Sequence, residues 1–289
     1  MESAPPALCR LQLGTELRRL RLQSGHKAGA VAKRLLWSPS KITRLEKGEN
    51  AIVELTDVMA LCAVYGADAE TRSTLEGYAV VTKTRRDWWQ SPKFRPVIRP
   101  SLKAFIGQEA TAERLHTYQP EFVPGLLQCE PYVRAIHQAT IMGLDEDDMD
   151  LLVTVRMTRQ EVLRRPNSPL KLTAVVNEAV LRREVGGADV TRQQLGYMID
   201  MARLPNVRLQ VVPFKAGLHP AMNGQFTILT FRNDAGLKPL LYMEKLADAW
   251  VLREDHTVAR YHDAFDELQA VAASPRESLR MIDQAIKEL

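Results

Sequence analysis

The sequence is poor in the features that mark secreted, membrane and metal-binding proteins. Its 289 residues include three cysteines, an odd number without CxxC spacing, so neither a disulfide framework nor a zinc site is expected. No run approaches the roughly 18–20 apolar residues that span a bilayer, and residues 1–12 lack the apolar stretch of a signal peptide. We therefore expect a cytoplasmic protein that needs neither a metal nor a cofactor.

Signatures of enzymes are missing as well. The six histidines form no HExxH pattern and no pair at a metal-binding spacing, and the sequence has no GxSxG elbow and no Walker-type glycine loop. The chain is accordingly not expected to be an enzyme, and no residue is assigned a catalytic role.

The excess of positive charge is confined to the first third of the chain. Residues 1–90 carry 14 Lys and Arg against 10 Asp and Glu, whereas residues 91–289 carry 25 of each. Between Arg10 and Lys47, ten basic residues stand beside two acidic ones. Because clustered positive charge attracts polyanions, this distribution predicts a polyanion-binding module joined to a neutral domain.

Short helices without a strand pattern are predicted in the basic segment. Apolar spacing places them at about 13–23, 39–47, 54–65 and 70–81, with another that ends near Leu36. The helix after residue 38 has the clearest boundaries, because Ser38 can cap it, Pro39 fits its first position and Gly48 suits a left-handed C-cap. Together these five helices predict a compact all-α module.

A linker and a mixed α/β domain are expected to follow. Three prolines within residues 92–100 predict a semi-rigid linker, and the adjacent Trp88 and Trp89 either pack it against a domain, which we favour, or stack on bases. Beyond it, alternating patterns predict an α+β fold. Helices are expected at 102–116, 130–140, 146–165, 191–203, 255–270 and 275–288, and strands at 171–176, 207–212, 225–231 and 240–243. Gly186 and Gly187 are expected to end a helix that carries Leu181.

The second and third helices have the spacing of a helix-turn-helix, whose last helix enters the major groove of DNA. Arg44 is the best candidate for a bidentate contact to guanine, and Ser40 and Thr43 are candidates for base edges or thymine methyl groups. The lysines are expected to bind phosphates. The alternative is an ordinary solvated helix face. The positions expected at DNA are Lys27, Pro39, Ser40, Lys41, Thr43, Arg44 and Lys47.

The stretch from Leu13 to Gly66 resembles the Xre/Cro-repressor class of helix-turn-helix domains, most closely at Ser38–Gly48. The resemblance implies a lambda-repressor-like fold in which Glu46 pairs with Arg21 and ties the third helix to the first. Glu46 is therefore interpreted as structural. The chain departs from this class where the second helix begins, because Lys27-Ala28-Gly29 replaces the usual Ser/Thr-Gln. That helix is expected to lack its cap and to offer a phosphate contact from Lys27.

The C-terminal part resembles the two-domain regulators of actinobacteria known as WhiJ-like or antitoxin-like regulators. These are typically encoded beside a small partner protein, so the resemblance implies such a partner here. The motifs that carry it are Glu109, Tyr118–Gln128, Tyr132, Arg156–Gln160, Asn177–Gly187, Val212–His219 and Tyr242–Glu244.

Polar residues within these motifs are candidates for a ligand or partner site. Glu109, Arg156, Glu178 and Glu244 could converge on a pocket, although an internal network of ion pairs is the favoured alternative. His219 is interpreted as a loop histidine. The whole candidate set is Glu109, Tyr118, Arg156, Glu178, His219, Tyr242 and Glu244.

These observations predict a sequence-specific DNA-binding transcriptional regulator, an antitoxin-like repressor that binds a two-fold operator as a homodimer. The expected parts are an all-α helix-turn-helix domain at 10–82, a Pro-containing linker at 83–103 and a mixed α/β regulatory, partner-binding domain at 104–289. Two other classes remain open. The C-terminal domain could hold the pocket of a small-molecule-responsive regulator, or it could be an enzyme fused to a DNA-binding module.

Overall fold

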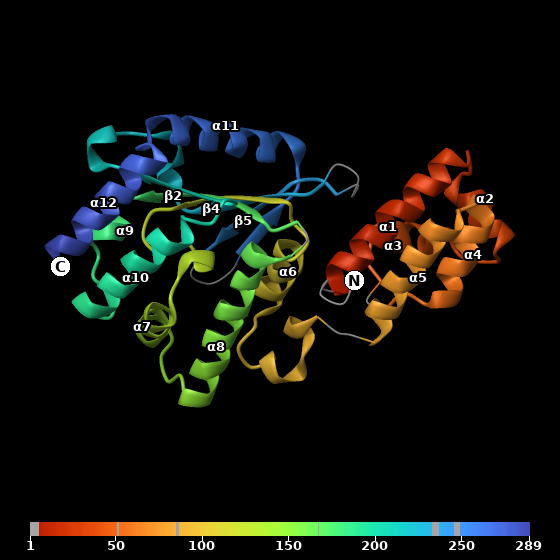
Figure 1. Cartoon of the computed structure of the whole chain (residues 1–289), viewed down its shortest axis with the longest axis horizontal. Coiled ribbons are helices and arrows are strands. Elements are labelled where there is room, and N and C mark those ends of the chain that lie inside the picture. Colours follow the sequence, from red (N-terminus) through yellow and green to blue (C-terminus); the bar gives the residue numbers. More distant parts are fainter. Residues whose placement is uncertain (1–5, 51, 85–86, 167, 233–236, 246–248) are drawn as a thin grey trace. The chain divides into compact units, whose positions relative to one another are not determined.

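The computed structural model describes residues 6–50, 52–84, 87–166, 168–232, 237–245 and 249–289, which form two compact units (Figure 1). The first unit comprises the chain up to Ser91 together with Phe231–Leu237, and the second comprises Pro92–Thr230 and Lys238–Leu289. No helix within these described ranges is long and apolar enough to cross a membrane.

The first unit is helical, as the sequence predicts. Its first helix begins well before the expected residue 13, because a distant acid supports its first turns. The carboxylate of Asp87 accepts hydrogen bonds from the backbone N–H of Ala7, at 2.9 Å, and from the guanidinium of Arg10, at 2.7 Å. The helices are α1 (Pro6–Gln23), α2 (Ala28–Arg34), α3 (Pro39–Glu46), α4 (Leu55–Tyr65) and α5 (Ala69–Thr84).

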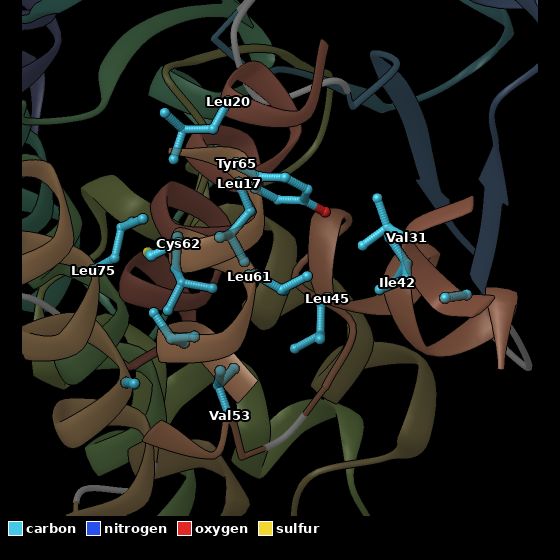
Figure 2. Packing of buried hydrophobic residues seen from close by; sticks show 14 residues of the cluster. Leu17, Leu20, Val31, Ile42, Leu45, Val53, Leu61, Cys62, Tyr65 and Leu75 are labelled. Atoms are coloured by element: carbon cyan, nitrogen blue, oxygen red, sulfur yellow. The ribbon is translucent and has the colours of Figure 1, made fainter. Parts of the chain in front are cut away.

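A single apolar core holds these helices together (Figure 2). Leu17 of α1, Leu45 of α3 and Leu61 of α4 are at most 1% exposed and belong to the same cluster. Val31 of α2 and Ile42 of α3 extend the core to the helix-turn-helix. Burying an apolar side chain of this size contributes about 1.5–3 kcal/mol, so the packing of α1 and α4 fixes the position of α3.

The second unit combines a sheet with helices. Its α-helices are α6 (Pro100–Glu109), α7 (Glu130–Thr140), α8 (Glu146–Arg159), α9 (Ala179–Arg182), α10 (Ala188–Met201), α11 (Asp255–Val271) and α12 (Pro275–Glu288). Its strands are β1 (Arg114–Gln119), β2 (Lys171–Asn177), β3 (Val207–Val212), β4 (Phe226–Thr230), β5 (Leu240–Glu244) and β6 (Ala249–Leu252). The predicted mixed α/β class is therefore correct.

The sheet is mixed, with the strand order β3-β2-β1-β4-β5-β6. β1, β2 and β3 are parallel, whereas β4, β5 and β6 each pair antiparallel with the strand before them in this order. Helix α11 lies on one face, and α6, α8 and α10 lie on the other (Figure 1). The chain reverses its direction of progress across the sheet between β1 and β4, which is where open α/β sheets commonly bind ligands.

Two strands and several boundaries differ from the sequence expectations. The helix expected at 102–116 ends at Glu109, and residues 114–119 form the central strand β1, which is fixed by pairing with both β2 and β4. The four-residue strand β6 was not predicted because its exposed Trp250 and Val251 give no core pattern. The α-helix expected to reach 165 stops at Arg159 and continues as the 3₁₀ turn Gln160–Arg164.

The region expected to be a linker is largely ordered into short helical turns. Helix α5 runs on to Thr84, and the 3₁₀ turns Trp88–Gln90 and Pro92–Phe94 follow, while residues 85–86 lie outside the described residues. Trp89 is buried, in agreement with the packing role rather than base stacking. The Gly186-Gly187 expectation is wrong: α9 ends at Arg182, and Gly187 is instead the N-cap of α10.

Candidate functional site

Helix α3 has well-defined ends. The side chain of Ser38 accepts a hydrogen bond from the backbone N–H of Lys41, at 3.3 Å, and Pro39 occupies the first turn. At the other end Gly48 adopts φ +66°, and the N–H of Glu49 bonds to the carbonyl of Arg44, which completes a Schellman cap. The helix predicted from these residues is present with the predicted caps.

One face of α3 is exposed and basic. Ser40, Thr43, Arg44 and Lys47 are exposed and stand at i, i+3, i+4 and i+7, so they form one stripe along the helix. We call these four residues the α3 stripe. The opposite side holds Ile42, which is fully buried. The guanidinium of Arg44 makes no hydrogen bond or ion pair to any described residue, so it is available to a ligand.

Two hydroxyls near the α3 stripe are already engaged within the helix. Thr43 Oγ1 donates to the carbonyl of Pro39 at 3.2 Å, and Ser40 Oγ lies 3.0 Å from Ser38 Oγ. The methyl group of Thr43 therefore faces outward more freely than its hydroxyl does. This arrangement favours the thymine-methyl contact over a hydrogen bond for Thr43.

Lys41 is placed differently from the other candidate DNA contacts. Its Nζ lies 2.7 Å from Oδ1 of Asp57 on α4 and 3.9 Å from the centroid of the Trp37 ring. Sequence reasoning missed both partners. Asp57 comes close to Lys41 only because α4 packs beside α3. Lys41 therefore braces α3, and a phosphate would have to compete with Asp57 for it.

The ends of helix α2 contain two exposed residues. Lys27 is its N-cap and makes no side-chain cap, as expected from the missing Ser or Thr. Leu36 lies in the turn between α2 and α3, is 94% exposed and has φ +56°. A left-handed Leu is strained because its Cβ crowds the backbone, and strain of this kind concentrates at functional turns.

Arg21 and Glu46 form the pair that the resemblance implied. Arg21 Nε lies 2.6 Å from Glu46 Oε1, and Nη2 lies 2.8 Å from Oε2, so the contact is bidentate. These hydrogen bonds raise the pKa of Arg21. Glu46 is 7% exposed, so its carboxylate points away from the α3 stripe and into the unit.

Gly14 allows α1 to touch α3. A Cβ at this position would lie 2.5 Å from the carbonyl oxygen of Leu45 and 2.7 Å from that of Glu46, which is closer than real contacts allow. Because both neighbours are backbone atoms, they cannot move aside cheaply. Sequence reasoning did not single out Gly14, since a glycine within a helix carries no signal of what lies opposite.

In the second unit, Glu109 is engaged by an arginine that the sequence analysis had not chosen. Its carboxylate accepts two hydrogen bonds from Arg159, at 2.8 and 2.9 Å, and the two side chains are 1% and 8% exposed. The ion-pair reading favoured for Glu109 is thus what the structure shows. Arg156, one turn earlier on α8, has no hydrogen bond or ion pair to a described residue.

Tyr242 and Glu244 lie on β5, on the sheet face that α6 and α8 cover. The Tyr242 ring stacks on Phe105 of α6, with centroids 4.1 Å apart, and is 6% exposed. Burial raises the pKa of Tyr242. Glu244 is exposed at the end of its strand. Its negative charge acts to raise the pKa of Arg156 and that of Tyr242.

Tyr118, His219 and Glu178 form a separate group at the carboxyl ends of the parallel strands. Tyr118 faces the α11 side, and its hydroxyl lies 3.4 Å from Nε2 of His219, a long contact. Glu178 accepts a hydrogen bond from the backbone N–H of Phe214, at 2.9 Å, and pairs with Arg182. The four charged residues considered for one pocket, with an ion-pair network as the favoured alternative, are therefore divided between two places, because Glu178 is held at this strand end.

Two models of known families match the chain, each over a different part of it. The chain matches the model of a helix-turn-helix domain over residues 12–75 and that of a domain of unknown function, DUF5753, over residues 102–284. The second match covers more than half of the chain. The chain belongs to the DUF5753 family.

No curated protein and no solved structure matches this DUF5753 chain. The helix-turn-helix match covers α1 to α4 and thus includes the α3 stripe, so the chain is a DNA-binding regulator. In the described part of the DUF5753 protein, no three His, Cys, Asp or Glu side chains gather as metal ligands would.

Proposed function

We propose that this DUF5753 protein is a transcriptional repressor of the Xre class that reads its operator with the α3 stripe. The observation that carries the proposal is the exposed Arg44, which makes no hydrogen bond or ion pair to a described residue and lies at the centre of a basic stripe on a capped helix. Guanine offers two acceptors to such a guanidinium in the major groove. The flanking Lys47, exposed beside it, suits a phosphate.

The repressor is proposed to bind as a homodimer to a two-fold operator, because one helix of this length reaches few base pairs. By its resemblance to the WhiJ-like, antitoxin-like regulators, its DUF5753 domain is proposed to bind a small protein encoded by a neighbouring gene. In this proposal the domain acts by binding, not by catalysis.

Selection of genomic fragments on the full chain, followed by sequencing, identifies the operator. On that operator, Arg44→Ala is expected to weaken specific binding by about 1–3 kcal/mol and to relax one base position. Arg203→Ala is the matched control, because it removes one exposed positive charge from the other unit. An equal loss on all sequences would make Arg44 a phosphate contact. If the selection enriches no fragment at all, the proposal is overturned.

A second candidate is a regulator that responds to a small molecule bound in the DUF5753 domain. The observation that favours it is Arg156, an arginine without a protein partner on a helix that packs against the sheet. Addition of a ligand at 100 times its Kd would raise the free energy of unfolding by about 2.7 kcal/mol. If the domain binds only a small partner protein, added small molecules leave its free energy of unfolding unchanged.

A further inference from the structure

A row of hydroxyl groups crosses the sheet on the face that α6 and α8 cover. Thr117 of β1 is the register partner of Thr227 of β4, which in turn is the partner of Tyr242 of β5. All three residues are at least 92% buried. The two threonine hydroxyls lie 3.0 Å apart and satisfy each other. The hydroxyl of Tyr242 makes no hydrogen bond to any residue that the structure describes.

The unpartnered guanidinium of Arg156 belongs to the same place. Arg159, one turn further along α8, has its guanidinium carbon 5.5 Å from the centroid of the Phe105 ring, on which Tyr242 stacks. Partial burial, together with the nearby charge of Arg159, lowers the pKa of Arg156 to about 10. Arg156 therefore remains charged at neutral pH. A partly buried cation of this kind gains from contact with an anion.

The nearby acids do not supply that anion. Glu109 is already held by both of its oxygens at Arg159. Glu244 attracts Arg156 from a distance but is exposed to water and forms no ion pair with it within the described residues. Within the described residues, the five N–H donors of the guanidinium therefore have no acceptor.

A glycine makes room for this guanidinium. Gly125 follows β1 in the 3₁₀ turn Gly125–Leu127, and a Cβ built on it would collide with Nη1 of Arg156. The loop after β1 and helix α8 thus meet beyond the carboxyl end of β1, beside the β1–β4 boundary, where the chain reverses its progress across the sheet. Gly125, Arg156 and Tyr242 come from three separate sequence motifs of the resemblance.

We propose that Arg156 and Tyr242 form a binding site for the oxyanion group of a small ligand, a carboxylate or a phosphate. The guanidinium offers two parallel N–H donors to such a group, and the tyrosine hydroxyl offers a third donor. The site rests on the second candidate function, for which it names the class of ligand. A metal cation is excluded from the site by the charges of Arg156 and Arg159.

The test measures binding of inorganic phosphate and, separately, of acetate to the full chain by calorimetric titration, with chloride at matched ionic strength as the reference. Saturable binding is expected for the unmodified chain. Arg156→Gln is expected to weaken it at least tenfold and Tyr242→Phe about threefold, whereas Arg203→Gln leaves it unchanged. Tighter binding of phosphate identifies a phosphoryl ligand, and tighter binding of acetate identifies a carboxylate; either result supports the site.

A stability measurement separates this role from a structural one. Without added anions, Arg156→Gln is expected to unfold at nearly the same temperature as the unmodified chain, because Arg156 makes no hydrogen bond or ion pair to a described residue. Gly125→Ala keeps the charge but displaces the guanidinium, and it is expected to weaken anion binding as well. This variant, together with Tyr242→Phe, decides the question if Arg156→Gln does not fold.

The proposal is overturned if neither probe binds saturably to the unmodified chain, or if Arg156→Gln, Gly125→Ala and Tyr242→Phe all bind the probes as the unmodified chain does. Operator binding is measured on the same samples. Loss of anion binding with normal operator binding refutes the site alone, whereas the absence of any operator with intact anion binding refutes the proposed repressor.

Discussion

Each unit of the protein contains a closed, bidentate Arg–Glu pair and, among its arginines, one candidate ligand contact that makes no hydrogen bond or ion pair to a described residue. In the helix-turn-helix unit these are Arg21–Glu46 and Arg44, and in the DUF5753 unit they are Arg159–Glu109 and Arg156. The difference lies in the surroundings of the unpaired arginine. Arg44 is exposed, whereas Arg156 is partly buried and has a lowered pKa.

This difference separates two ways of preparing a positive charge for a ligand. An exposed guanidinium keeps its hydration, so Arg44 costs the fold little and its contact with a polyanion weakens with salt. A partly buried guanidinium has lost part of its hydration, so an anion gains more from contact with Arg156 than from contact with a fully exposed arginine. The first arrangement suits a long DNA surface, and the second suits one small anion.

The largest expected effect contrasts the closed pair of the DUF5753 unit with an exposed ion pair of the same unit. Glu109→Ala leaves Arg159 buried without a counter-charge, and we expect the free energy of unfolding to fall by about 3–5 kcal/mol in urea titrations of the full chain. Glu113→Ala is the control, because Glu113 forms an exposed pair with Lys171 at 3.2 Å and is expected to change stability by less than about 1 kcal/mol. Similar losses in both variants would remove the contrast between buried and exposed charge.

The closed pair at Glu109 also shows what the sequence alone leaves open. Arg156 and Arg159 are one turn apart on α8, so periodicity places both toward the same side but does not say which one meets Glu109. That choice depends on where α6 ends relative to α8, which the sheet fixes. The Arg21–Glu46 pair came from resemblance to a known class, not from spacing.

Local signals predicted helices better than strands for a physical reason. The Ser38 cap and Gly48 lie within the segment they define, so α3 was located correctly. β1 carries Arg114, His116 and Gln119 among its residues, which hides its strand pattern, and its two neighbours lie far away in the chain. Asp87, which supports the start of α1, is likewise invisible to any local window.

Acid should weaken the DUF5753 unit through His116. Burial, reinforced by the charge of His262, lowers the pKa of His116 to about 4, against about 6.5 in an unfolded chain. Between these values the unfolded chain binds more protons, so stability falls as the pH falls from about 6.5 to 4. The expected loss from this group is about 2–3 kcal/mol.

Urea titrations at pH 6.5 and pH 4.5 measure this loss. His116→Gln removes the titrating group and is expected to reduce the pH dependence, whereas His256→Gln, at an exposed position, leaves it unchanged. If both variants show the same pH dependence of the free energy of unfolding, His116 does not titrate as its burial implies.

A smaller effect is expected at the closed pair of the helix-turn-helix unit. Glu46→Ala leaves Arg21 beside water and still bonded to the carbonyl of His26, at 3.1 Å. We expect a loss of about 1.5–3 kcal/mol, seen as a lower melting temperature, with base preference retained. Glu49→Ala is the exposed control. A change in base preference at an unchanged melting temperature would instead place Glu46 in contact with DNA.

The smallest effect concerns two lysines of the same helix, and salt dependence distinguishes them. Lys47 is exposed, with Glu49 3.8 Å away, so Lys47→Ala is expected to reduce the salt slope of operator binding by about one phosphate contact, or 0.9.

Lys41 is held at 2.7 Å by Asp57, so Lys41→Ala is expected to reduce the slope by less than half as much and to lower stability by about 0.5–1 kcal/mol. A full unit of slope lost at Lys41 would mean that DNA opens the pair with Asp57. Lys41 would then be a phosphate contact that is paired with Asp57 in the free protein.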